Sequence, residues 1–215
     1  AGLVGKNIFE KLCQIPTEVD IASEFRYRDP IIDDKTLCIY VSQSGETADT
    51  IAALKLAKSR GATTLTITNV IGSSITRESD YSIYTHAGPE IAVASTKAYT
   101  SQVALLASLG VYFAEVLGSS SEETLREIKK DLLDLPSKIE TILKNTDSIK
   151  QIANNIYNQT NMFFIGRGTD YNVALEGSLK LKEISYIHSE AYAAGELKHG
   201  PIALIEKGIT VVGIL

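Results

Sequence analysis

Short apolar runs rich in β-branched residues alternate with longer segments of helical periodicity, and this alternation constrains the fold more than any other feature. The expected strands are Leu37–Val41, Thr63–Thr68, Tyr81–Tyr84, Met162–Ile165 and Ile209–Leu215. Two of the expected helices are Thr50–Ser59 and Lys97–Leu117. Strands that alternate with helices form βαβ units, whose parallel sheets are covered by helices on both faces. The sequence therefore predicts an α/β fold with mostly parallel sheets.

An internal repeat runs through the chain, because one constant shift superposes its beginning on its end. The shift that places Leu3 on Leu175 also places Gly5 on Gly177, Ile15 on Ile187, Glu18 on Glu190, Glu24 on Glu196 and Leu37–Val41 on Ile209–Gly213. This agreement indicates a duplication, so we expect two related α/β domains in tandem. Under the same shift, the counterpart of Met162–Ile165 would precede Ala1, and the counterpart of the loop after Val41 would follow Leu215. We therefore expect the chain to begin and end inside a domain.

The repeat and the periodicity divide the chain into three parts. Residues 1–117 are expected to form the first domain without its first strand, and residues 149–215 the start of the second domain. Residues 118–148 connect them. In this connection, apolar residues recur every three or four positions from Glu122 to Asn145, which predicts an amphipathic helix after the polar linker Gly118–Ser121. Pro136 is expected to break or kink that helix, because proline cannot donate the backbone hydrogen bond.

The overall charge and the two cysteines exclude several classes of function. The net charge is −5 and no basic stripe is visible, so we expect no nucleic acid partner. No apolar run approaches the roughly 20 residues that cross a bilayer, so we expect no membrane. Cys13 and Cys38 have neither disulfide-framework nor metal-ligand spacing, and no grouping of histidines and carboxylates has metal-ligand spacing either. We therefore expect unpaired thiols, no metal and a reducing, cytoplasmic setting.

The expected strand Leu37–Val41 runs directly into a polar loop, and a helix follows from about Thr47. The polar residues of this loop are Ser42, Gln43, Ser44, Glu46 and Thr47. The N-terminus of a helix carries about half a positive charge and suits a phosphate dianion, and open α/β sheets bind ligands at the carboxyl ends of their strands. The alternative is an ordinary N-cap, for which one hydroxyl would suffice. The number of hydroxyls favours the anion site.

A second strand-to-helix connection is the segment Val93–Lys97. Ser95 or Thr96 is expected to be the N-cap of the long helix that follows. Contact of Ser95 with a ligand is the other interpretation, and the pattern alone favours the cap.

The expected helix Tyr171–Ile187 carries an acid–base–acid cluster of Glu176, Lys180 and Glu183. At about 100° per residue these three side chains share one arc with apolar neighbours, whereas Ser178, Lys182 and Ser185 form the opposite, solvated face. A carboxylate among apolar groups has a raised pKa and can serve as a proton-transfer base. The alternative is a surface pair between residues four apart, which contributes only a few tenths of a kcal/mol. Spacing alone leaves both interpretations open.

A histidine lies between glycine and proline in the segment Gly195–Pro201. His199 is therefore held on a turn, and an ordinary histidine pKa near 6.5 suits proton transfer. Taken alone, such a histidine is more often a simple turn residue.

These motifs together resemble the isomerase half of the glutamine:fructose-6-phosphate aminotransferases, also called glucosamine-6-phosphate synthases. The segments that carry the resemblance are Ser42–Thr47, Val93–Lys97, Leu175–Tyr192 and Gly195–Leu204. That half of the family is built from two SIS (sugar isomerase) domains, and the resemblance runs from Ala1 to Leu215. The stretch from Lys180 to Pro201 is very specific, whereas the serine-rich loop marks only the broader SIS family.

The resemblance implies a role for each matching residue. It implies that Ser42, Gln43, Ser44 and Thr47 hold the sugar phosphate and that Val93 and Ser95 contact the sugar. It implies further that Glu183 moves the proton between carbons 1 and 2, with Lys180 beside it and Glu176 in the same pocket. His199 would assist opening of the sugar ring, and in the family this histidine comes from the neighbouring subunit of a homodimer.

The family converts fructose 6-phosphate and ammonia to glucosamine 6-phosphate without a cofactor, and its glutaminase domain supplies the ammonia. The resemblance therefore implies fructose 6-phosphate, glucosamine 6-phosphate and glucose 6-phosphate as ligands. The glutaminase domain, the first strand and the C-terminal tail with its imine-forming lysine have no counterpart in this chain, so glutamine-dependent synthesis is not expected from it alone. Two alternatives are a non-catalytic SIS regulator that senses a sugar phosphate and a related isomerase or deglycase without a glutaminase. A sensor needs no proton shuttle, so Glu183 together with His199 argues against the regulator.

Overall fold

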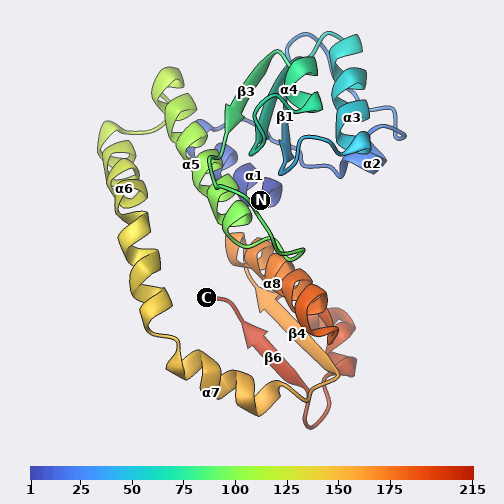
Figure 1. Ribbon diagram of the computed structural model, residues 1–215, viewed down its shortest axis with the longest axis vertical. Helices are drawn as coiled ribbons and strands as arrows, with labels where there is room; N and C mark the ends of the chain where they lie inside the picture. Colours follow the sequence, from blue (N-terminus) through green and yellow to red (C-terminus); the bar gives the residue numbers. More distant parts are fainter. The chain divides into compact units, whose positions relative to one another are not determined.

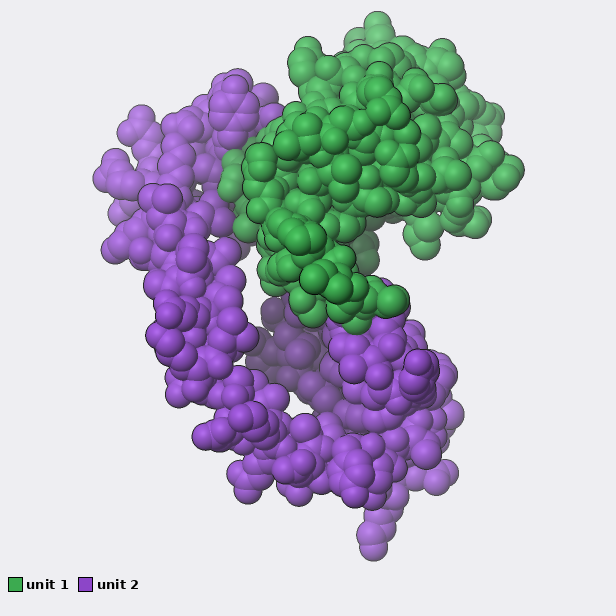
Figure 2. All heavy atoms as spheres, in the orientation of Figure 1, with its two compact units in different colours: residues 1–6, 15–109 green, residues 7–14, 110–215 purple.

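The computed structural model describes residues 1–215, whose helices and strands are drawn in Figure 1. The chain forms two compact units, coloured separately in Figure 2. Unit 1 comprises Ala1–Lys6 and Ile15–Leu109, and unit 2 comprises Asn7–Gln14 and Gly110–Leu215. The expected partition into 1–117, 118–148 and 149–215 stays a prediction.

Unit 1 contains a parallel three-stranded sheet in the order β1-β2-β3. Its strands are β1 (Leu37–Ser42), β2 (Thr63–Thr68) and β3 (Tyr81–Tyr84). The central strand β2 pairs with β1 over its whole length and with β3 from Leu65 onward. Because all three strands are parallel, their carboxyl ends lie at one edge of the sheet. The three strands expected in this part of the chain are confirmed, because their β-branched residues suit a sheet that is covered on both faces.

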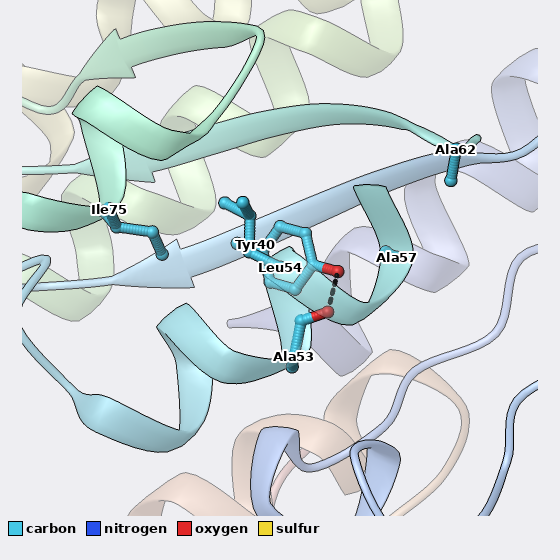
Figure 3. Packing of buried hydrophobic residues seen from close by; sticks show 6 residues of the cluster. All are labelled: Tyr40, Ala53, Leu54, Ala57, Ala62 and Ile75. Carbon is cyan, nitrogen blue, oxygen red and sulfur yellow. Dashed lines mark hydrogen bonds between the residues drawn. The ribbon is translucent and has the colours of Figure 1, made fainter. Parts of the chain in front are cut away.

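Helices α2 (Ala22–Phe25), α3 (Ala48–Ser59) and α4 (Ser74–Glu78) belong to unit 1. The core on this side of the sheet is shown in Figure 3 and consists of Tyr40, Ala53, Leu54, Ala57, Ala62 and Ile75. Two alanines of α3 allow the helix to approach the sheet closely, and the hydroxyl of Tyr40 donates to the carbonyl of Ala53 at 3.1 Å. Burial raises the pKa of Tyr40 well above its usual value, so this hydroxyl remains a donor.

Unit 2 contains the second parallel sheet, in the order β5-β4-β6. Its strands are β4 (Asn161–Gly166), β5 (His188–Ala193) and β6 (Thr210–Gly213). The remaining elements of this part are α6 (Glu122–Lys144), α7 (Asp147–Ile156), α8 (Thr169–Ser185) and the 3-10 helices η1 (Leu197–His199) and η2 (Pro201–Leu204). Helix α8 packs on β4 through Gly177, where an added Cβ would lie 3.2 Å from the ring of Phe164.

Strand β5 was not among the strands expected from the sequence. Its residues, HSEAYA, include no Val, Ile or Thr, so the local signal for a strand is weak. The strand forms because it pairs in parallel along the whole of β4, from His188 beside Asn161 to Ala193 beside Gly166. Here tertiary pairing overrides local propensity.

Helix α6 runs without interruption through Pro136, so the expected break is wrong. Pro136 is exposed, and the carbonyl left without a donor can therefore bond to water. The N-terminus of α6 is capped by Ser121, whose hydroxyl accepts the N–H of Thr124 at 3.2 Å.

Helices α1 (Gly2–Cys13) and α5 (Lys97–Leu117) each contribute residues to both units. By length and composition alone, α5 could cross a membrane, with a mean hydropathy of 1.4 over its most apolar window. The expectation that no apolar run approaches membrane-spanning length is therefore wrong. The core helix of a soluble protein has the same composition, and several α5 side chains are buried, namely Ala98, Leu106, Leu109, Val111 and Ala114.

The internal repeat is visible in the way that two helices end. Helix α1 ends at Cys13 and is followed by Gln14 with φ = 57°; α8 ends at Ser185 and is followed by Tyr186 with φ = 61°. The shift found in the sequence places Gln14 on Tyr186, so both copies stop the helix with a left-handed residue that is not glycine. Such a residue is uncommon, and its recurrence at equivalent positions supports the duplication.

Candidate functional site

The polar loop Ser42–Thr47 connects β1 to α3 at the carboxyl edge of the first sheet. The hydroxyl of Ser42 is buried and accepts the N–H of Gly45 at 3.1 Å, and the hydroxyl of Ser44 accepts the N–H of Glu46 at 3.2 Å. Two serines therefore shape the loop from within. Ser44 and Thr47 are exposed, so their O–H groups are available to an anion outside the loop.

The start of α3 leaves further donors available beside this loop. The first turn of an α-helix has N–H groups without intrahelical acceptors. Thr47 occupies the N-cap position, but its side chain makes no capping hydrogen bond. The ordinary N-cap interpretation is therefore not supported by Thr47. An anion bound here would meet unpaired N–H groups at the positive end of the helix dipole.

We call the loop Ser42–Thr47 the anion loop. Two acidic side chains, one in this loop and one just after it, interact with groups outside it. Glu46 accepts the backbone N–H of Ser74 at 2.8 Å, and hydrogen bonds from the side chain and backbone of Ser74 hold the pKa of Glu46 below its usual value. Asp49 forms an ion pair with Arg26 at 2.7 Å. Both carboxylates thus have partners elsewhere, which reduces their repulsion of an anion at the loop.

Gly45 is required by the packing of the loop against the protein. Its φ is +68°, and a Cβ at this position would lie 2.2 Å from the Oγ of Ser73. The carbonyl of Gly45 also accepts the N–H of Ile75 at 3.0 Å. The close approach of the loop to Ser73 therefore excludes a side chain at this position.

The second predicted contact region lies between β3 and α5. Val93 is 97% exposed and Ser95 is partly buried. Ser95 or Thr96 was expected to cap α5, and this stays a prediction. The N–H of Ala98 in the first turn donates to the carboxylate of Glu90 at 3.1 Å. Local spacing could not identify this contribution, because Glu90 lies eight positions before Ala98.

The acid–base–acid cluster on α8 forms as the helical spacing predicted. The ammonium of Lys180 lies 3.6 Å from a carboxylate oxygen of Glu176 and also donates a hydrogen bond to Glu183. The three side chains are between 20% and 29% exposed, so the cluster is accessible from one side and shielded on the other. A carboxylate held by a fixed ammonium is suitably placed for proton transfer.

The expected solvated face of this helix needs one correction. Ser178 is only 2% exposed and its hydroxyl lies 2.9 Å from the hydroxyl of Ser189 in β5. Ser189 in turn donates to the carbonyl of Ser178 at 2.8 Å. Ser178 therefore faces the sheet, while Lys182 and Ser185 are exposed as expected. Because β5 was not predicted, the side of the helix that it covers was assigned to solvent.

His199 is the last residue of η1, and its backbone N–H donates to the carbonyl of Glu196 at 2.9 Å. Gly200 follows with φ = 132°, and Pro201 begins η2. The predicted turn around this histidine is therefore present. The imidazole is exposed, so it is accessible to a partner that approaches from outside.

Sequence reasoning missed a row of polar side chains along β5. His188 lies 3.3 Å from Glu190, and the hydroxyl of Tyr192 donates to the other oxygen of the same carboxylate. Hydrogen bonds from Tyr192 and then His188 lower the pKa of Glu190. The alternation of these residues would have indicated one face of a strand. No cluster of three or more His, Cys, Asp or Glu residues within residues 1–215 could hold a metal ion.

Residues 1–112 and 155–215 match the SIS domain family. The chain belongs to this family. Over all of its length it is 62% identical to a glutamine–fructose-6-phosphate aminotransferase [isomerizing] from Clostridium perfringens, and it covers 35% of that protein. It is 51% identical to the protein of the same name from Thermococcus kodakarensis and covers 36% of it. The chain thus spans little more than a third of the length of these relatives.

Solved SIS structures have the same fold. The C-terminal domain of glucosamine-fructose-6-phosphate aminotransferase from Francisella tularensis matches with a TM-score of 0.95 and 43% identity, over 99% of this chain and 60% of that one. Glucosamine-6-phosphate deaminase from Thermotoga maritima matches with a TM-score of 0.75 and 26% identity, over 98% and 62%. The resemblance seen in the sequence and the expected α/β SIS fold with parallel sheets are confirmed.

Proposed function

We propose that this chain is the isomerase part of a glutamine–fructose-6-phosphate aminotransferase and carries out ketose-to-aldose isomerisation after ammonia transfer. The observation that carries the proposal is the shielded cluster of Glu176, Lys180 and Glu183 on α8, which offers a carboxylate held by an ammonium. The names of the relatives at 62% and 51% identity support the substrate, fructose 6-phosphate.

The phosphate of the sugar is assigned to the loop after β1. Ser44 and Thr47 offer exposed hydroxyls, Gln43 offers an amide, and Ser42 holds the loop through Gly45. The first turn of α3 adds unpaired N–H groups. Val93 and Ser95 are assigned to the sugar itself. Glucose 6-phosphate and glucosamine 6-phosphate carry the same phosphate and are the other proposed ligands.

Proton transfer is assigned to Glu183. Its carboxylate removes a proton from carbon 1 of the open-chain imine, the electron pair forms the double bond between carbons 1 and 2, and the electrons of the former C2=N double bond move to the nitrogen, which takes up a proton. Glu183 then returns its proton to carbon 2 while the carbon-1 hydroxyl loses its proton and becomes the aldehyde carbonyl. Lys180 fixes the carboxylate by their hydrogen bond, and Glu176 holds the other side of the ammonium. Opening of the sugar ring is assigned to His199. None of these steps requires a metal or a cofactor, because proton transfer is the only chemistry.

The same proposal includes the partners of the chain. We expect a homodimer in which His199 acts in the site of the neighbouring subunit, since this imidazole is exposed on its turn. We expect a glutaminase domain in the intact protein, because the aminotransferases of which this chain covers 35% and 36% are much longer. A cytoplasmic location follows from the same assignment. The non-catalytic regulator is disfavoured by the high identity to aminotransferases.

Calorimetric titration of the intact protein with fructose 6-phosphate tests the proposal, with Ser44→Ala as the variant. We expect saturable binding that is weaker in Ser44→Ala by about 1–3 kcal/mol, the usual cost of losing a charge-assisted hydrogen bond. Thr76→Val is the control, because the hydroxyl of Thr76 donates to the carbonyl of Ser73, the N-cap residue of α4, and not to the loop. No saturable binding by the wild-type protein would overturn the proposed substrate; equal affinity in folded Ser44→Ala would remove this loop from the site.

A further inference from the structure

Asn69 is the residue that follows β2, the central strand of the first sheet, at its carboxyl end. Its side-chain oxygen accepts the N–H of Ala87 at 2.8 Å and the hydroxyl of Thr85 at 3.0 Å. Its side-chain nitrogen donates to the carbonyl of Gly88 at 2.7 Å. One partly buried amide therefore makes three hydrogen bonds to the segment that follows β3. Such a concentration of bonds is more than a surface asparagine needs.

The backbone of the same residue reaches the neighbouring strand on the other side. The N–H of Asn69 donates to the carbonyl of Gln43 at 3.2 Å, and the hydroxyl of Thr68 donates to the same carbonyl at 3.3 Å. Gln43 belongs to the anion loop after β1. Asn69 thus connects the loop after β1 with the segment after β3, through its backbone on one side and its side chain on the other.

The segment held by the side chain of Asn69 has an unfavourable backbone conformation. His86 has φ = 51° and Gly88 has φ = 69°. A left-handed residue that is not glycine costs free energy and persists only where neighbouring contacts hold it. The side chain of Asn69 forms hydrogen bonds on both sides of His86, to Thr85 before it and to Ala87 and Gly88 after it. The chain then continues to Val93 and Ser95, the residues assigned to the sugar.

We propose that Asn69 is a positioning residue for substrate recognition, which fixes the segment carrying Val93 and Ser95 relative to the anion loop. This inference rests on the proposed function, since it presumes that both segments meet a sugar phosphate. The backbone and the side chain of Asn69 have different hydrogen-bond partners, and the inference therefore has a specific consequence. Only the backbone of Asn69 forms a hydrogen bond to the anion loop, so loss of the side chain disturbs recognition of the sugar and leaves recognition of the phosphate group intact.

The test compares two probes, fructose 6-phosphate and inorganic phosphate, by calorimetric titration of the intact protein. Asn69→Ala removes all three side-chain bonds without adding a charge that would itself repel phosphate. We expect the affinity for fructose 6-phosphate to fall about tenfold, the equivalent of one lost hydrogen bond, and the affinity for inorganic phosphate to change less than about twofold. Thr85→Val removes one bond and keeps the shape, so about a threefold loss for fructose 6-phosphate is expected even if Asn69→Ala fails to fold.

Asp80→Ala is the matched control. Asp80 accepts the N–H and the hydroxyl of Thr64 at 2.9 and 2.7 Å, and so joins β2 to the start of β3 at the opposite edge of the sheet. If the role of Asn69 were merely structural, Asn69→Ala and Asp80→Ala would have similar effects on the stability of the protein and on its affinity for fructose 6-phosphate. Unchanged affinity for fructose 6-phosphate in Asn69→Ala or Thr85→Val, or an equal loss for both probes, would overturn the inference. Absence of wild-type binding to fructose 6-phosphate would instead overturn the proposed function, and the inference with it.

Discussion

At the scale of single residues, Lys180 holds two carboxylates of different proposed function. Glu183 is bonded directly to its ammonium, whereas Glu176 lies 3.6 Å away on the preceding turn. Residues three and four apart on a helix lie on one face, so the sequence could predict this triad from spacing alone. Spacing could not show that the opposite side of the helix is covered by β5, where Ser178 lies against Ser189.

Glu183→Gln keeps the shape of the side chain and removes the proton acceptor. Positioned general bases contribute about 100- to 10,000-fold in rate, so isomerisation should fall by that order while substrate affinity barely changes. The measurement is NMR of the exchange of the carbon-1 or carbon-2 proton with deuterated water in the intact protein. Lys182→Gln, which alters an exposed neighbour, should exchange at nearly the wild-type rate. Wild-type exchange in Glu183→Gln would refute the role of Glu183 and leave His199 as the next candidate.

At the scale of elements, the anion loop is supported by α4, which follows the next strand. The carbonyl of Gly45 bonds to Ile75 and the carboxylate of Glu46 bonds to Ser74. The sequence indicated the loop through its hydroxyls, but not these supports, because Ser74 and Ile75 are almost thirty positions away and no local pattern pairs them with the loop.

Gly45→Ala should destabilise the protein more than Gly72→Ala. Both glycines have left-handed backbones, with φ of +68° and +74°, but only at Gly45 would the added Cβ meet a neighbour, the Oγ of Ser73. The backbone conformation alone costs alanine about 1–2 kcal/mol, and the clash adds to it at Gly45. Urea unfolding of both variants measures the difference. Equal losses would mean that Ser73 moves aside freely.

Asp80, at the junction of β2 and β3, makes the stability of the folded protein depend on pH. Hydrogen bonds from Lys58 and then Thr64 lower the pKa of Asp80 from 3.8 to about 2. A carboxyl with a depressed pKa in the folded state stabilises the protein above its unfolded value, and this stability is lost as the pH falls toward the folded value. The free energy of unfolding should therefore fall more steeply between about pH 4 and pH 2 in the wild-type protein than in Asp80→Asn. Parallel slopes in urea titrations over that range would contradict the assignment.

At the scale of the whole molecule, both cysteines are free, as the sequence predicted. Burial raises the pKa of the thiols of Cys13 and Cys38, so little reactive thiolate forms at neutral pH. Iodoacetamide should label the native protein slowly and label both cysteines at once after denaturation, without any reductant. Intact mass spectrometry measures the adducts. A cysteine that is labelled only after a reductant is added would show that the expected reducing setting is wrong.

The sequence by itself determined the elements whose signals are local. The strands β1, β2 and β3 follow from runs of β-branched residues, the cluster on α8 from helical spacing, and the loop after β1 from its hydroxyls at a helix start. The internal shift even anticipated the equivalent ends of α1 and α8. Each of these depends on residues within a few positions of one another, or on a repeat that can be read directly.

Only the tertiary structure decided the features that depend on partners distant in sequence. Strand β5 exists because β4 pairs with it, Ser178 is buried because Ser189 covers it, and the bonds of Asn69 join segments that follow three different strands. Hydrogen-bond partners across a parallel sheet are separated by whole βαβ crossovers, so neither propensity nor periodicity specifies them. The residues of the proposed site were named from the sequence, and the contacts that support them are a property of the folded chain.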